Sequence, residues 1–304
     1  MVAGEIPPFP LEEEYKKNTG ITPDDVKELR RWLKTQPHLP DEHITDMDLI
    51  LAYHSCNKST GVTKQVLDLN LTLKTLFTQY FKDRKFDAGV ERTLNNLLLT
   101  LLPTRTKEGY AIFYTHFLNT DPKVFVFSEA IKACLMVLDF YQYEEGTWPG
   151  ITFVIDFEGM TLGHVTRIDL VNLQQFLYYL QEAMLVKLMG LQFINAPSFI
   201  DRVVMMMKPF LKKEMMDILG IHTVGSESVK KHFPIEALPK DFGGSYKSSL
   251  ECRDELISKL RANASYFENE NKKRVVESLR PGKPKTISDI FGGLEGSFKK
   301  LDID

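Results

Sequence analysis

Between residues 109 and 222, short strand-like runs alternate with longer helical runs. Three of the runs are rich in β-branched and aromatic side chains and are bounded by Gly or Pro: residues 110–114, 151–155 and 191–194. Apolar residues recur every three or four positions in two segments between them, residues 127–141 and 173–188. The order strand, helix, strand, helix, strand predicts an α/β fold with a mostly parallel sheet built from right-handed crossovers.

The chain before and after this region has a different character. Residues 22–80 have helical periodicity: Asp24 or Thr22 can cap a helix that ends near Gln36-Pro37, and two further helices follow. From about Glu251, a charged helix leads into a Pro/Gly-rich stretch at residues 280–284. We therefore predict three parts: an amino-terminal all-helical domain (1–92), an α/β domain (93–250) and a carboxy-terminal extension (251–304).

Charge and hydropathy exclude several classes of function. With 38 Lys and Arg against 41 Asp and Glu residues, the net charge is −3, which argues against nucleic acid as the main partner. The longest uncharged stretch, residues 188–200, is too short to cross a bilayer. The first residues lack the pattern of a signal peptide, and three widely spaced cysteines predict no disulfide framework. We expect a cytoplasmic protein.

Searches for catalytic and metal-binding motifs find little. Nucleotide-binding, metalloprotease and nucleophile-elbow patterns are missing, and the seven histidines show no helical pairing of the kind that binds metal. Asp156 and Glu158 at a strand end could divide general acid and base roles. The alternative, which we favour, is that they cap the strand and turn the chain. Cys134 lies on the apolar side of a helix without an adjacent base, so we predict no catalytic residue and no metal.

One segment is unusually rich in methionine. Residues 195–219 contain five of the eleven methionines: Met205, Met206, Met207, Met215 and Met216. Two neighbouring apolar rows run along this helix, Phe199, Val203 and Met207 in one and Ile200, Val204 and Leu211 in the other. A buried core helix explains the pattern, but flexible methionines also suit a surface that repacks around different partners. Lys208-Pro209 is a place where the helix can break or hinge.

Five motifs in consecutive order carry a family resemblance. They are DPKVF at 121–125, IDFEG at 155–159, GLQFINAP at 190–197, KPFL at 208–211 and LPKDFGG at 238–244. Over residues 20–304 the chain resembles the CRAL-TRIO lipid-transfer family, and in particular its tocopherol- and retinaldehyde-binding members. Residues 29–33 and 36–40 resemble the family's amino-terminal domain, and the tail, with Phe291-Gly292 and residues 295–298, resembles insect members.

The resemblance implies a helical domain packed on an α/β domain, whose sheet floors one apolar cavity closed by a mobile gate helix at about residues 198–207. It implies a set of ligand-binding side chains: Ile131, Cys134, Leu138, Ile151, Phe153, Ile155, Phe176, Tyr179, Leu180, Leu188 and Leu191. It also implies a set of gate side chains: Phe199, Val203, Val204, Met207, Phe210 and Leu211.

The chain departs from the tocopherol-binding pattern at two places. Lys187 matches one of the basic residues that grip a phosphoinositide headgroup there, but Glu214 and Ile218 replace a lysine and an arginine. We expect membrane contact through Lys187, Lys208, Lys212 and Lys213, with little phosphoinositide dependence. Cys134 and Leu138 stand where serines would anchor the ligand, so the bound molecule is either less polar than tocopherol or anchored elsewhere, for instance by Tyr179.

The resemblance predicts a function in binding and carriage. We expect a monomer without cofactor that binds one small hydrophobic molecule, such as a retinoid, tocopherol, carotenoid or similar isoprenoid, and transfers it between membranes that it contacts transiently. Two alternatives remain open. An adaptor would recruit partners through the carboxy-terminal tail, and an enzyme would act on an apolar substrate with Asp156 and Glu158 as its acids.

Overall fold

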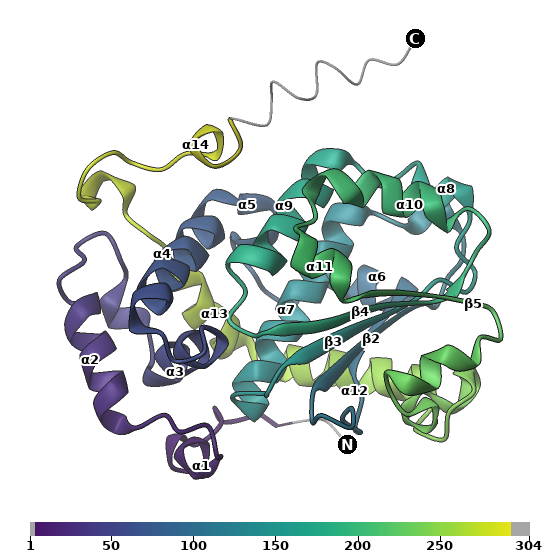
Figure 1. The fold of residues 1–304 in the computed structure, drawn as a ribbon, viewed down its shortest axis with the longest axis horizontal. Helices are drawn as coiled ribbons and strands as arrows, with labels where there is room; N and C mark the ends of the chain where they lie inside the picture. Colours follow the sequence, from purple (N-terminus) through teal and green to yellow (C-terminus); the bar gives the residue numbers. More distant parts are fainter. Residues whose placement is uncertain (1–3, 293–304) are drawn as a thin grey trace.

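The computed structural model describes residues 4–292, which form a helical unit packed beside a sheet that helices cover on both faces (Figure 1). The predicted resemblance of residues 295–298 to the tail of insect members lies outside the described residues. No helix among residues 4–292 combines the length and the apolar character that crossing a bilayer requires.

Within that range, the strands form one five-stranded sheet in the order β1-β2-β3-β4-β5. The strands are β1 (Leu97–Leu101), β2 (Ala111–Phe117), β3 (Ile151–Asp156), β4 (Leu188–Ala196) and β5 (Leu219–Thr223). β1 pairs antiparallel with β2, and all other neighbours are parallel. Phe113, Phe153 and Leu191 lie side by side across the three central strands. The predicted α/β class with a mostly parallel sheet is confirmed.

Helices cover both faces of this sheet (Figure 1). One face lies beneath α7 (Phe127–Glu145), α9 (Leu170–Glu182) and α10 (Ile200–Met207), and the other beneath α12 (Ser249–Ala262). Three further helices occur among residues 88–217: α6 (Ala88–Asn96), α8 (Leu162–Val165) and α11 (Lys213–Asp217). Short 3-10 turns lie at Asp41–His43, Pro122–Val124, Lys208–Phe210, Glu227–Lys231, Ile235–Ala237, Lys240–Phe242 and Glu277–Leu279.

The helical prediction for residues 173–188 was wrong at its end. α9 stops at Glu182, and Leu188 begins β4, where it pairs with Ile151 of β3. The leucine spacing continues past the helix because a buried strand also requires apolar residues, and Leu188 and Leu191 occupy such positions in β4. Neither β1 nor β5 was predicted. β1 reads LLLTL, a short apolar run that periodicity alone cannot assign to helix or strand.

The amino-terminal residues form the predicted small helical unit. It contains α1 (Leu11–Lys16), α2 (Pro23–Leu33), α3 (Asp46–Ser55), α4 (Thr60–Leu76) and α5 (Thr78–Phe81). Thr22 caps α2 in a capping box with Asp25, and Pro23 occupies the first helical position. Leu29, Leu33, Leu49, Leu67 and Leu71 form its core together with apolar neighbours.

A ladder of alternating buried charges joins this unit to the rest of the chain. Lys273, the C-cap residue of α13 (Ala264–Lys272), pairs with Asp48 of α3 at 2.8 Å and with Glu270. Glu270 also pairs with Lys74 of α4 at 3.3 Å. Asp139 of α7 lies 4.0 Å from Lys74 and 2.6 Å from Arg84. Burial alone would raise the pKa of Glu270, but Lys273 and Lys74 hold that pKa well below its ordinary value.

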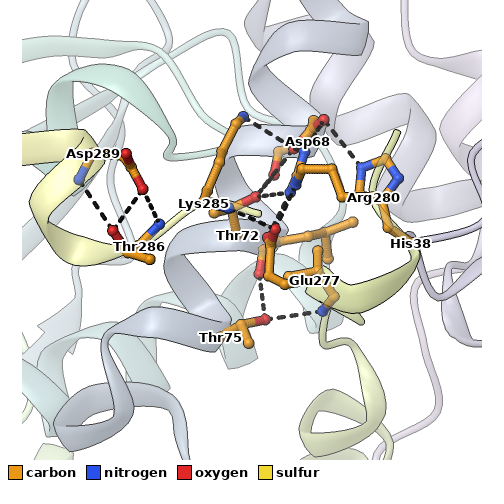
Figure 2. A network of polar contacts seen from close by, with 11 residues as sticks. His38, Asp68, Thr72, Thr75, Glu277, Arg280, Lys285, Thr286 and Asp289 are labelled. Atoms are coloured by element: carbon orange, nitrogen blue, oxygen red, sulfur yellow. Dashed lines mark hydrogen bonds and ion pairs between the residues drawn. The ribbon is translucent and has the colours of Figure 1, made fainter. Parts of the chain in front are cut away.

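Beyond α13 the chain crosses back over α4 as a strap, defined here as residues 277–292 (Figure 2). Arg280 donates two hydrogen bonds of 2.8 Å to the Asp68 carboxylate, which also contacts His38 and Lys285. The strap ends in α14 (Ile287–Phe291), and the ring of Phe291 packs against Phe77 and Tyr178. The predicted carboxy-terminal extension therefore contacts both the helical unit and α9. Its predicted boundary at residue 251 stays a prediction.

We predict that Glu270→Gln lowers the free energy of unfolding by about 3 kcal/mol, because the change leaves the buried ammonium groups of Lys74 and Lys273 without their shared carboxylate. Glu268→Gln on the exposed side of the same helix is the matched control and should be neutral. Urea denaturation measures both. Equal stability of the two variants would show that the ladder contributes nothing to holding the halves together.

Candidate functional site

A cavity of about 180 Å³ lies between the sheet and the helices α7, α9 and α10. Its walls are almost wholly apolar. The strands contribute Leu97, Leu99, Thr115, Phe117, Phe153, Ile155, Asp156, Leu191 and Phe193. The helices contribute Phe127, Ala130, Ile131, Cys134, Leu173, Phe176, Leu177, Leu180, Val203, Met206 and Met207, and connecting segments add Phe125, Phe157, Met160 and Ile168.

Backbone periodicity decides which side chains reach this cavity. Along β3, Phe153 and Ile155 face the cavity, whereas Val154 between them belongs to the core on the opposite face of the sheet. On α7, Ile131 and Cys134 are three residues apart and therefore share one side of the helix. Burial raises the pKa of the Cys134 thiol to about 12, so the thiol is inert, as predicted.

The structure brings together most of the side chains predicted to bind ligand, but not all. Seven of them line the cavity: Ile131, Cys134, Phe153, Ile155, Phe176, Leu180 and Leu191. Leu138 and Ile151 are buried in the surrounding core and do not reach it. The hydroxyl of Tyr179 accepts a hydrogen bond of 3.1 Å from Asn70 of α4, outside the cavity. Leu188 lines a different cleft.

α10 closes one side of the cavity with three residues: Val203, Met206 and Met207. Val203 and Met207 were predicted. Met206 was missed, although it neighbours Met207 in the sequence. The other predicted gate side chains pack against the apolar core without lining the cavity: Phe199, Val204, Phe210 and Leu211. Met205 points outward, with 64% of its surface exposed.

Polar contacts hold the chain where it leaves α10. The Gln181 side chain of α9 donates a hydrogen bond of 2.9 Å to the Phe210 carbonyl oxygen. Its amide oxygen accepts a hydrogen bond of 2.8 Å from the backbone N–H of Lys212. Glu182, next to Gln181, pairs with the Lys212 ammonium. α10 is therefore tied to α9 just beyond the break at Lys208-Pro209.

Sequence reasoning also missed five aromatic side chains that line the cavity: Phe117, Phe125, Phe127, Phe157 and Phe193. Phe193 could have been found, because it stands two residues after Leu191 and so shares its face of the strand. The other four lie at or beyond the ends of regular elements, where no periodicity applies.

The carboxylate pair at the end of β3 does not form a catalytic dyad in this cavity. Asp156 accepts hydrogen bonds from the Tyr114 hydroxyl at 2.7 Å, from the Asn195 amide at 2.9 Å and from the Glu158 backbone N–H at 3.0 Å. Burial alone would raise the pKa of Asp156, but His116 and these hydrogen bonds hold that pKa below its ordinary value. Glu158 is exposed. The favoured interpretation, that the pair caps the strand and turns the chain, agrees with this geometry.

A second cleft, of about 700 Å³, separates the helical unit from α9, β4 and α11. Lys187, Lys212, Glu214 and Ile218 line it together, facing Ser55, Asn57 and Ser59. Lys212 is already paired with Glu182, and Glu214 adds a negative charge. Lys208 and Lys213 are exposed but do not line the cleft. Two of the four lysines predicted for membrane contact, Lys187 and Lys212, thus meet in this cleft, and the acidic neighbours leave it little net positive charge.

Family models match most of the chain. Residues 95–244 match the CRAL/TRIO domain, and residues 18–88 match the Pinta-like UBA domain. Among curated proteins, "Alpha-tocopherol transfer protein-like" of Mus musculus is 22% identical over 200 residues, which are 66% of this chain and 53% of that protein. "Clavesin-1" of Xenopus laevis is 23% identical over 235 residues, 76% of this chain and 70% of that protein. The match thus spans about half the length of the tocopherol-transfer-like relative.

Among solved structures, "Crystal structure of Sfh5" is similar with a TM-score of 0.44 and 14% identity, covering 95% of this chain and 97% of that one.

Proposed function

This chain carries a CRAL/TRIO domain, and we propose that it binds one small hydrophobic molecule in the apolar cavity and transfers it between membranes. The observation that carries the proposal is the cavity itself, whose walls offer apolar side chains from the sheet and from α7, α9 and α10, and hardly any polar group. The proposed carrier works as a cytoplasmic monomer without cofactor or chemistry. Its ligand is a retinoid, tocopherol, carotenoid or similar isoprenoid.

Energetics explain why a carrier of this kind needs a gate. Each CH₂ group moved from water into the cavity contributes about 0.8 kcal/mol, so ten groups contribute about 8 kcal/mol. The competing environment is a bilayer, which is equally apolar and cancels most of that gain. Selectivity then depends on the shape of the walls, and exchange depends on opening the cavity at a membrane surface.

The dimensions of the cavity indicate how a ligand enters. Its volume of about 180 Å³ is below the roughly 300 Å³ at which small-molecule pockets begin. Three of the wall residues are methionines, Met160, Met206 and Met207, whose unbranched side chains change rotamer at low cost. We propose that α10 moves outward as the gate and that these methionines repack around the ligand.

The proposed membrane contact lies on the outer side of the gate. Met205 is exposed there, and Lys208, Lys212 and Lys213 follow it. Each such lysine near an anionic surface contributes about 1 kcal/mol, and salt screens it. Diffuse attraction of this kind needs no specific headgroup.

We predict that the protein purified from its own tissue carries one apolar small molecule per chain. Native mass spectrometry followed by solvent extraction measures its mass and stoichiometry. Lipid-stripped protein should then bind an isoprenoid of the same class. A stripped protein that binds no retinoid, tocopherol, carotenoid or sterol would contradict the carrier proposal.

We predict that Met207→Lys weakens ligand binding by more than about 100-fold, because an ammonium in the closed cavity carries a desolvation cost of several kcal/mol. The sheet and the helical unit should stay folded, since an open gate leaves the lysine in water. Met205→Lys, two residues earlier on the exposed side, is the control and should bind normally.

Circular dichroism melting and a ligand titration of Met207→Lys together show whether Met207 is a gate residue or an ordinary core residue. A variant that melts near wild type and no longer binds supports the gate. One that unfolds, or that binds ligand as the wild type does, excludes it.

We predict that phosphatidylinositol phosphates accelerate ligand transfer between liposomes no more than phosphatidylserine of equal charge, because Glu214 and Ile218 leave the second cleft without a basic cluster. The double variant Glu214→Lys/Ile218→Arg should acquire a phosphoinositide-specific acceleration. A large headgroup-specific effect in the wild type would show that Lys187 and Lys212 suffice as a clamp.

A further inference from the structure

Three metal-ligating side chains converge near the carboxyl ends of β2 and β3. His116, Asp156 and Glu158 each bring a donor atom within 4.8 Å of the other two. In parallel sheets this edge is where ligands commonly bind. Asp156 is hydrogen-bonded there to Tyr114, which belongs to the core on the sheet face opposite the lipid cavity. Asp156 also borders the apolar cavity, so the cluster adjoins the site proposed above, but metal binding is a different function from holding an apolar ligand.

His116 has a buried ring nitrogen that lacks a hydrogen-bond partner among residues 4–292. Its residue is 5% exposed, yet its Nδ1 atom makes no hydrogen bond with any of the residues described. Nδ1 lies 3.3 Å from Asp156 Oδ2, close enough for an ion pair but outside hydrogen-bond geometry. Buried nitrogen atoms of this kind nearly always have a partner. A cation bound between the two atoms would provide it.

The distance between these two atoms suits a bound metal. Zinc binds histidine nitrogen and carboxylate oxygen at about 2.0–2.2 Å, so two donors in a tetrahedral site lie about 3.4 Å apart. The observed 3.3 Å between His116 and Asp156 is already that separation. Glu158 sits exposed on the turn after β3 and can rotate its carboxylate toward the pair without moving the sheet.

Neighbouring residues hold the two buried donors in place. Asn195 and the Glu158 backbone N–H bind Asp156 Oδ1, and the Tyr114 hydroxyl binds Oδ2. The ring of Phe242 lies against the His116 imidazole, with the ring centroids 3.6 Å apart. Outer contacts of this kind orient metal ligands and restrict water around them.

We propose that His116, Asp156 and Glu158 bind one divalent transition-metal ion, for which Zn²⁺ is the best candidate. A histidine nitrogen favours Zn²⁺ over Mg²⁺ and Ca²⁺, which prefer all-oxygen sites. Three protein ligands leave a fourth position to water. The bound ion joins β2 to the turn after β3 and so braces the edge of the sheet.

Co²⁺ titration of the metal-free, tag-free full chain tests the site, because Co²⁺ bound at a four-coordinate protein site absorbs visible light. We expect one Co²⁺ per chain and displacement by Zn²⁺. Glu158→Gln and His116→Phe should each weaken binding at least 10-fold. His232→Gln removes an exposed histidine elsewhere and should leave binding unchanged.

Two results would overturn the proposal. One is no saturable Co²⁺ absorption in the wild type. The other is binding that Glu158→Gln leaves unaltered, which would assign the ion to another place on the surface. Because Glu158 is exposed, that variant stays folded even if His116→Phe does not. The NMR signals of the His116 ring give an independent readout, and ring signals that saturating Zn²⁺ leaves unchanged also exclude the site.

Discussion

The alternating charges of Asp48, Lys273, Glu270, Lys74 and Asp139 set the position of the helical unit on the α/β domain. An apolar interface tolerates small displacements, whereas a buried ammonium that loses its carboxylate costs several kcal/mol. The ladder therefore favours the arrangement in which all of these pairs form. Asn70 of α4, the helix that carries Lys74, also donates hydrogen bonds to the Tyr179 hydroxyl of α9 and to the carbonyl oxygen of its C-cap residue, Ala183. The position of α9, and with it one wall of the cavity, depends on this polar contact.

The central strand serves two different sites with alternate residues. Phe153 and Ile155 line the apolar cavity, while Val154 packs in the opposite core and Asp156 forms hydrogen bonds with Tyr114 and Asn195. One mostly parallel sheet can thus support an apolar cavity and a polar cluster close to each other, because successive side chains of a strand point to opposite faces. Substitutions at neighbouring positions of β3 should consequently affect different properties.

Sequence periodicity predicted those features of the structure that depend on the residue pattern of a single strand or helix. The Gly-bounded runs gave β2, β3 and β4, and helical spacing placed Ile131 and Cys134 on one wall of the cavity. Leu138 continues the same spacing along α7 but does not line the cavity. The local sequence pattern does not reveal how far along the helix the cavity extends. The charge ladder and the cluster of His116 with Asp156 combine residues far apart in the sequence. Only the packing of the whole chain brings them together.

The strap has a consequence for the order of events during synthesis. Asp68 binds Arg280, 212 residues later in the chain, and Lys74 binds Glu270, 196 residues later. At ribosomal rates of about 5–20 residues per second, these early side chains wait roughly 10–40 s for their partners. Throughout that interval α4 exposes charges that belong in the interior. The amino-terminal helices can form early, but their final docking awaits the synthesis of α13 and the strap.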